Sequence, residues 1–267
     1  MFRMWPGTQD WGSWLTSVSV PAHPEADEKT STNPVLQAQG LVREYGSVIA
    51  VDEIDLSLAR GEFLTIFGPN GAGKTSLLAL LAGALRPSRG QVWLRGEPLD
   101  FGEVEWRRRI GVLSHQSFLY GHLSAEENLR FYGQLFGLSD VDNVVRDKLQ
   151  HLGLQERAAS LVRDLSHGMR QRLALARALL HDPDIVLLDE PYTGLDPSAA
   201  LVLQGVLSDL RDGRRTVVMV THNLSEGVAL ATTVAIMNRG RFVWQGKRAE
   251  LGDDFGQFYH SVIEGHG

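Results

Sequence analysis

A glycine-rich segment has the residue types and the spacing needed to bind phosphate. It matches the pattern G-x-x-x-x-G-K-[ST] at every position and reads Gly68-Pro69-Asn70-Gly71-Ala72-Gly73-Lys74-Thr75. Glycines let such a segment curl so that its backbone N–H groups point inward at phosphate oxygens. The start of a following helix adds partial positive charge. The segment therefore predicts a loop that holds the phosphates of a nucleotide.

The residues on either side of this loop support the prediction. Residues 63–67 form an apolar run typical of a buried strand, and residues 76–85 have the pattern of a helix. We expect Lys74 to reach the β- and γ-phosphates, Thr75 to ligate Mg²⁺, and Ser76 to contact the α-phosphate. The alternative is a glycine-rich turn that matches by chance, and the flanking strand and helix argue against it.

A second apolar run, residues 185–188, ends in two carboxylates, Asp189 and Glu190. We expect Asp189 to hold Mg²⁺, directly or through water, as an acid at this place does in phosphate-loop enzymes. Glu190 is then free to orient or deprotonate the attacking water. The alternative is two solvated acids at a strand end, which the phosphate loop earlier in the chain disfavours.

A serine and a glycine precede another helical pattern, in the sequence Leu165-Ser166-His167-Gly168-Met169. Ser and Gly before a helix form either a helix cap or a second anion site. The segment resembles the L-S-G-G-Q signature of the ABC ATPase family at Ser166 and Gly168, and departs from it at His167 and Met169. The resemblance implies that Ser166 and Gly168 contact the γ-phosphate, and the departures bear on the strength of that contact.

Other features resemble the same family and follow in its order. They match an aromatic that stacks on adenine, a glutamine that senses the metal and the attacking water, an acid in a loop at the dimer interface, and a histidine that contacts the γ-phosphate. Here these are Tyr45, Gln116, Asp196 and His222. Each alone has a structural alternative, such as a surface aromatic or a strand-end histidine. Together, with the resemblance spanning roughly residues 35–250, they identify the chain as a member of the ABC ATPase family.

This resemblance implies ATP and Mg²⁺ as ligands and a head-to-tail homodimer. Each nucleotide would lie between the phosphate loop of one subunit and Ser166 of the other. The expected catalytic residues are Glu190, His222 and Gln116, and the expected metal ligands are Thr75, Gln116 and Asp189. ATP binding would close the dimer, and hydrolysis would reopen it, because ADP lacks the contacts of the γ-phosphate.

The pattern outside the motifs predicts an α/β fold, with a P-loop NTPase core whose mostly parallel sheet is flanked by helices. Residues 185–188 and 216–220 are continuous apolar runs, as central parallel strands are. Alternation at residues 35–41 and 54–58 predicts an N-terminal antiparallel β portion, and residues 234–244 predict a closing hairpin. Residues 118–180 are mostly helical by period and predict an inserted helical subdomain.

Three parts follow from these patterns. Residues 34–252 form the predicted ATPase domain, and residues 253–267 form a short C-terminal tail. Residues 1–33, rich in Pro, Ser and Thr, have the composition of a disordered extension. The tryptophans in this extension are either incidental or part of a docking segment for a partner or a membrane surface; they are Trp5, Trp11 and Trp14.

Composition excludes several classes of protein. The chain has no cysteine, which rules out disulfides, thiolate zinc sites and cysteine catalysis. Its net charge of −6 argues against nucleic acid as the main partner. No run approaches the roughly 18 apolar residues that span a bilayer, and the N-terminus lacks a secretory pattern. Together with these absences, the family resemblance implies a peripheral protein at the cytoplasmic face of the inner or plasma membrane, held by a polytopic permease subunit.

Two classes of ABC protein remain as alternatives. A single cassette without a long heptad run favours a transporter motor over a soluble ABC ATPase that works on ribosomes or DNA. Residues 114–132 resemble exporter ATPases, and more narrowly the haem exporter subunit of cytochrome c maturation, at His115-Gln116 and residues 127–132. The signature is also similar to those of drug- and polysaccharide-type exporters. Two alternatives remain for Phe118, Tyr120 and Phe131. They either contact the membrane subunit or pack in the core of the helical subdomain.

Overall fold

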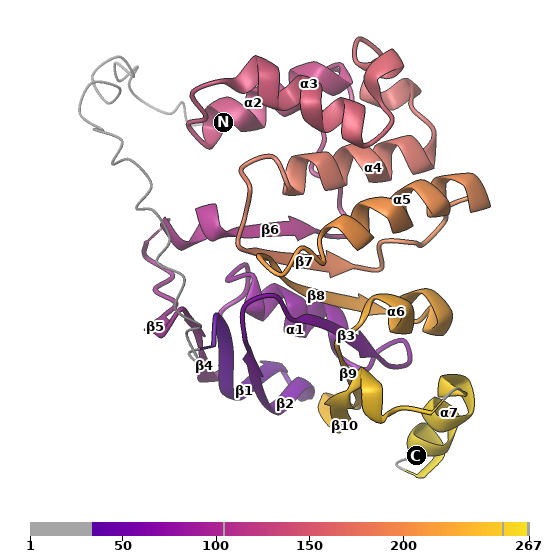
Figure 1. Cartoon of the computed structure of the whole chain (residues 1–267). Coiled ribbons are helices and arrows are strands. Elements are labelled where there is room, and N and C mark those ends of the chain that lie inside the picture. Colours follow the sequence, from indigo (N-terminus) through magenta and orange to yellow (C-terminus); the bar gives the residue numbers. More distant parts are fainter. Residues whose placement is uncertain (1–33, 104, 253, 266–267) are drawn as a thin grey trace, which may run out of the picture. The chain divides into compact units, whose positions relative to one another are not determined.

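The computed structural model of the chain describes residues 34–103, 105–252 and 254–265 (Figure 1). The predictions made for residues 1–33 lie outside the described residues.

The larger sheet is mostly parallel, as predicted. Its strand order is β10-β9-β3-β8-β7-β6, and only the edge strand β10 runs antiparallel to its neighbour. The strands are β3 (Phe63–Phe67), β6 (Ile110–Leu113), β7 (Ile185–Asp189), β8 (Thr216–Thr221), β9 (Thr233–Asn238) and β10 (Arg241–Lys247). β6 was absent from the sequence prediction, because its four residues include Gly111 and follow the three arginines 107–109.

The smaller sheet is the predicted antiparallel portion, in the order β2-β1-β4-β5. Its strands are β1 (Leu36–Tyr45), β2 (Val48–Leu58), β4 (Arg89–Leu94) and β5 (Glu97–Pro98). β1 and β2 are longer than predicted, and their pairing continues to Tyr45 opposite Val48. Register shifts along this ladder break the regular alternation on which the prediction relied.

Seven α-helices surround the two sheets. They are α1 (Lys74–Leu81), α2 (Ala125–Leu135), α3 (Val141–His151), α4 (His167–Ala178), α5 (Pro197–Asp209), α6 (Leu224–Leu230) and α7 (Phe255–Gly265). Short 3₁₀ helices are η2 (Glu105–Arg109), η3 (Gln155–Arg157), η4 (Val162–Asp164) and η5 (Arg248–Glu250). These counts refer to the described part of the chain.

One helical prediction differs from the structure in its bounds, and the predicted C-terminal tail contains a helix. α1 begins at Lys74 and ends at Leu81, whereas residues 76–85 were predicted. Gly73, with φ of 102°, lets the helix start directly after the loop, and Gly83, with φ of 62°, follows its end. Within the predicted C-terminal tail, α7 packs through Phe255 onto Phe67, with ring centroids 4.8 Å apart.

The larger sheet is buried on both faces. Alternate residues of β3 and β7 belong to two different hydrophobic clusters: Leu64 and Leu187 pack with α1 and the smaller sheet, whereas Phe63 and Leu188 pack with helices α2 to α5. Such burial explains why these strands are continuous apolar runs. Helices α2, α3 and α4 lie together, on the side of the larger sheet away from β1, β2 and β4 (Figure 1).

Candidate active site

One edge of the larger sheet collects most of the predicted residues. Phe67 at the end of β3 lies opposite Thr221 of β8, and Asp189 at the end of β7 lies opposite Val220. β6 ends beside β7 and runs in the same direction. Since the carboxyl ends of parallel strands meet at one edge, this sheet brings together the phosphate loop, the two acids, His222 and the segment that contains Gln116.

The phosphate loop joins β3 to α1 and is shaped by its glycines. Gly71 and Gly73 have φ angles of 80° and 102°, a region that favours glycine. A Cβ atom at Gly73 would lie 1.9 Å from the carbonyl oxygen of Ala50, and one at Gly68 would lie 2.2 Å from that of Met237. These two glycines are therefore required by close backbone approach.

Lys74 is held over its own loop. Its Nζ donates to the carbonyl oxygens of Gly68, at 2.8 Å, and Pro69, at 3.1 Å. Burial lowers the pKa of Lys74, and the nearby charges of Glu190 and Asp189 oppose that shift. The ammonium group thus sits between the loop and the two acids, where an anionic phosphate would be attracted by it.

Thr75 and Asp189, both expected to ligate a metal ion, are in contact. The Thr75 hydroxyl donates to Asp189 Oδ1 at 3.3 Å, and Asp189 is only 5% exposed. Burial raises the pKa of Asp189, while the Thr75 hydrogen bond lowers it. A hydroxyl and one carboxylate are the hard oxygen donors that suit Mg²⁺, which takes few protein ligands beside substrate phosphates. The donor set therefore fits the ion.

Glu190 adopts an unusual backbone conformation for a non-glycine residue, with φ of 49°. Its Oε2 accepts hydrogen bonds from the Thr221 hydroxyl at 3.1 Å and from Nδ1 of His222 at 2.8 Å. The backbone N–H of His222 is 3.3 Å from the same oxygen. Two of the three residues predicted to be catalytic, Glu190 and His222, are thus in direct contact.

Gln116 is exposed, and its backbone carbonyl accepts a hydrogen bond from the Ser114 hydroxyl at 2.8 Å. His115, the residue before Gln116, lies beside Asp189, with its Nδ1 3.9 Å from Asp189 Oδ2. Sequence reasoning missed His115 and Thr221 as members of this site. Their positions next to Gln116 and His222 were the available signal.

Ser166 and Gly168 belong to a second group of predicted residues, at the start of α4. Ser166 caps this helix by accepting from the N–H of Met169 at 3.2 Å. A Cβ at Gly168 would lie 2.9 Å from that of Ala199 on α5, so the two helix starts are in close contact. His167, which departs from the family signature, has its Nε2 3.1 Å from the Thr193 carbonyl oxygen.

Asp196 and Tyr45 have other surroundings. Asp196 caps α5 by accepting from the N–H of Ala199 at 2.9 Å. Tyr45 is 47% exposed at the end of β1, and the Arg43 guanidinium lies 4.6 Å from the centre of its ring. Among the hydrogen bonds of the described residues, none joins the group at Ser166 to the phosphate loop. The chain thus presents two separate sets of candidate ligands.

Comparison with known proteins identifies the family. Residues 51–193 match the family model of the ABC transporter. The Nod factor export ATP-binding protein I of Cupriavidus pinatubonensis is 38% identical over 235 residues, which cover 87% of this chain and 72% of the relative. The chain belongs to the ABC transporter family, as an ATP-binding subunit. Members of the family hydrolyse ATP, and this chain is an ATPase.

Another relative works in the opposite direction of transport. The spermidine/putrescine import ATP-binding protein PotA of Pseudomonas aeruginosa is 37% identical over 213 residues, covering 79% of this chain and 58% of the relative. Sequence similarity to transport ATPases thus extends to both exporters and importers. In the described residues, we find no helix long and apolar enough to cross a membrane.

A solved structure confirms the predicted fold. A dimeric ATP-binding cassette in a post-hydrolysis state, bound to ADP and Pi, matches with a TM-score of 0.73 at 26% identity. The match covers 80% of this chain and 98% of the other. The P-loop core with a mostly parallel sheet and an antiparallel β portion is therefore that of ABC nucleotide-binding domains.

Proposed function

We propose that the chain powers an ABC exporter, as a homodimer attached to a polytopic permease at the cytoplasmic face of the membrane. The observation that carries this proposal is the separation of the two candidate ligand sets on one chain. No hydrogen bond of the described residues joins the phosphate loop to Ser166, which supports a nucleotide site completed by a second copy. The export relative supports the direction of transport.

The residues of the phosphate loop hold the nucleotide in this proposal. The backbone N–H groups of Gly68 and residues 70–73 surround the phosphates, Lys74 reaches the β- and γ-phosphates, and Ser76 contacts the α-phosphate. Thr75, Asp189 and Gln116 would hold Mg²⁺, which would neutralise phosphate charge when bound. Tyr45, exposed at the end of β1, offers the face of its ring to adenine.

Glu190 and His222 carry the chemical step. A Glu190 carboxylate oxygen orients the attacking water and takes its proton as the water oxygen bonds to the γ-phosphorus. The bond from that phosphorus to the β,γ-bridging oxygen breaks in the same step, and ADP is the leaving group. His222 donates a hydrogen bond from its Nδ1–H to that carboxylate and holds the Glu190 side chain in place. Its other ring nitrogen is available to the γ-phosphate. The work is positioning and charge stabilisation, as in other phosphoryl transfers.

The second copy completes the site. Ser166 and Gly168 at the start of α4 present backbone N–H groups and partial positive charge to the partner's γ-phosphate. Asp196 lies in the neighbouring loop, tied to the signature through the close approach of Gly168 to Ala199. ATP would hold the two copies together, and loss of Pi after hydrolysis would release them.

An aromatic surface offers a place for the permease. Phe118, Tyr120 and Phe131 are 54%, 47% and 40% exposed, which argues against their forming the core of the helical region. Tyr120 packs edge-on against Phe131, with ring centroids 5.2 Å apart. Tyr132 donates its hydroxyl hydrogen to the Phe118 carbonyl oxygen. We infer that these neighbouring exposed aromatic side chains form the contact with the permease.

The transported substrate is the most specific part of the proposed function. Haem export for cytochrome c maturation rests on the resemblance of residues 115–132 alone. A general drug- or polysaccharide-type exporter is the second candidate, and the Nod factor export relative favours it.

The test is co-purification of the tagged chain from detergent-solubilised membranes in the presence of ATP and Mg²⁺. A polytopic membrane subunit in the complex is the expected result, and a haem-loaded one would assign the cargo. Recovery of ribosomal or DNA-associated proteins alone would contradict the transporter role and leave the ATPase activity standing.

A further inference from the structure

An ion pair behind the phosphate loop ties the two sheets together. We propose that the Asp52–Arg241 pair positions the phosphate loop for nucleotide binding, through the turn that contains Gly240. The inference rests on the proposed nucleotide site and adds positioning residues that touch neither phosphate nor metal. Asp52 lies on β2 and Arg241 on β10, the edge strands of the smaller and larger sheets.

The loop is supported from behind by backbone atoms of both sheets. The Gly240 N–H, in the turn between β9 and β10, donates to the carbonyl oxygen of Ala72 within the loop at 2.9 Å. On one side, the Ala50 carbonyl of β2 leaves no room for a Cβ at Gly73. On the other, the Met237 carbonyl of β9 leaves none at Gly68. The loop therefore keeps its shape only while β2 and the turn keep their positions.

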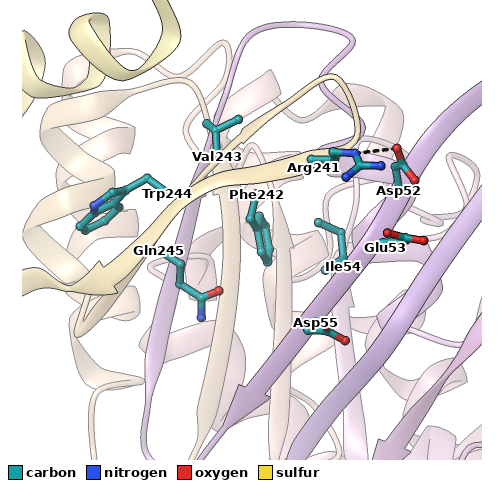
Figure 2. Close-up of a pocket in the computed structure, with 9 residues that line it drawn as sticks. All are labelled: Asp52, Glu53, Ile54, Asp55, Arg241, Phe242, Val243, Trp244 and Gln245. Atoms are coloured by element: carbon teal, nitrogen blue, oxygen red, sulfur yellow. Dashed lines mark hydrogen bonds and ion pairs between the residues drawn. The ribbon is translucent and has the colours of Figure 1, made fainter. Parts of the chain in front are cut away.

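Asp52 fixes that turn to β2 in two ways. Its backbone N–H donates to the Gly240 carbonyl oxygen at 2.9 Å. Its side chain accepts from Nε of Arg241 at 2.7 Å, which Figure 2 shows as Arg241 reaching across from β10. Gly240 thus links Asp52 on one side to Ala72 on the other, through its own peptide groups.

Beyond the pair, β2 and β10 separate. A cavity of about 370 Å³ opens between them, lined by residues 52–55 and 241–245 (Figure 2). The pairing of β10 with β9 also shifts register between Phe242 and Trp244. Because the strands diverge at the cavity, the Asp52–Arg241 contact holds the β9–β10 turn against β2 at the end of these strands nearest the phosphate loop.

A second ion pair on β10 provides a matched control. Lys247, at the far end of the strand from the turn, is 2.6 Å from Glu62. The side chains of Lys247 and Glu62 are 57% and 21% exposed. Those of Arg241 and Asp52 are 59% and 20% exposed. The two pairs therefore have almost the same solvent screening, and only one of them adjoins the phosphate loop.

The experiment measures ATP and ADP affinity by fluorescence titration, and amide exchange of residues 67–76, in purified folded protein. We expect Asp52→Lys and Arg241→Glu each to lower the affinity for both nucleotides by roughly threefold to fivefold, which is the scale of an exposed ion pair. Both should speed exchange in the loop peptide. The double variant Asp52→Lys/Arg241→Glu should restore both readouts, and Lys247→Glu should leave them at wild-type values.

The outcomes separate the two proposals. Wild-type protein that binds no nucleotide would contradict the proposed site itself. If the wild type binds and both Asp52→Lys and Arg241→Glu keep its affinity and its loop exchange, the positioning role is wrong. The positioning role is also wrong if Lys247→Glu loses as much nucleotide affinity as Asp52→Lys and Arg241→Glu do. The loss would then be a general effect of disturbing the edge strands.

Discussion

Nδ1 of His222 lies 2.8 Å from Oε2 of Glu190, so the residue that follows β8 is joined to the residue that follows β7. An ionised carboxylate only accepts hydrogen bonds, and Nδ1 therefore carries a proton in this contact. The bond turns the Glu190 side chain toward His222, on a backbone whose φ is 49°. Strained backbone of this kind is found at sites where a side chain must be aimed.

Replacing Glu190 with Gln should remove hydrolysis and keep nucleotide binding. The amide oxygen can still accept from His222, whereas the amide cannot take a proton from water. We expect turnover to fall by about 10²- to 10⁴-fold, the usual contribution of a general base. A steady-state phosphate-release assay measures this, with Glu97→Gln on the exposed edge strand β5 as the control. Wild-type turnover in Glu190→Gln would refute the assigned role.

Alanine at Gly73 should abolish nucleotide binding, because its Cβ would meet the Ala50 carbonyl oxygen at 1.9 Å. Gly205 is the matched site: it lies inside α5, and a Cβ there meets nothing within 4 Å. Gly205→Ala should bind ATP normally and gain about 0.5–1 kcal/mol in the free energy of unfolding. Isothermal titration and urea unfolding test both variants. Normal ATP affinity in Gly73→Ala would show that the loop is not the nucleotide site.

Polar substitutions on the aromatic surface should detach the chain from its membrane partner. We expect Tyr120→Ser/Phe131→Ser to reduce co-purification of the permease and to leave the ATPase activity of the isolated chain near wild type. Leu201→Ser is the control, because Leu201 on α5 is 68% exposed and away from this surface. Equal loss of the partner in both variants would argue against a specific docking surface.

His181 should make the fold sensitive to acid. Burial lowers its pKa to about 4 from 6.5, and its ring stacks on that of Phe136 at 3.9 Å between centroids. The unfolded chain binds a proton at His181 below its ordinary pKa, and the folded chain does not. Folding stability therefore falls as the pH drops, by about 2 kcal/mol from this residue between about pH 7.5 and about pH 5.

Urea unfolding at the two pH values measures this effect. His181→Gln should lose that part of the pH dependence, whereas His122→Gln, at an exposed histidine, should retain it. An unchanged pH dependence in His181→Gln would show that His181 is protonated equally in both states.

The sequence was informative wherever chemistry constrains residue type within a short segment. The phosphate loop needs Gly68 and Gly73 for close approach, so its pattern predicted its structure. By contrast, β6 depends on partners distant in the chain: Gly111 lies against the carbonyl oxygen of Ala178, where a Cβ would be 2.2 Å away. The contact between His115 and Asp189 also arises only when β6 aligns beside β7.

Enclosure of ATP between two copies is tested most directly by the mass of the Glu190→Gln variant in solution. Analytical ultracentrifugation with saturating ATP and Mg²⁺ should show a two-chain species that returns to one chain when ADP replaces ATP. A species of one chain with ATP bound would contradict the account, because the phosphate loop would then hold ATP without the partner's Ser166.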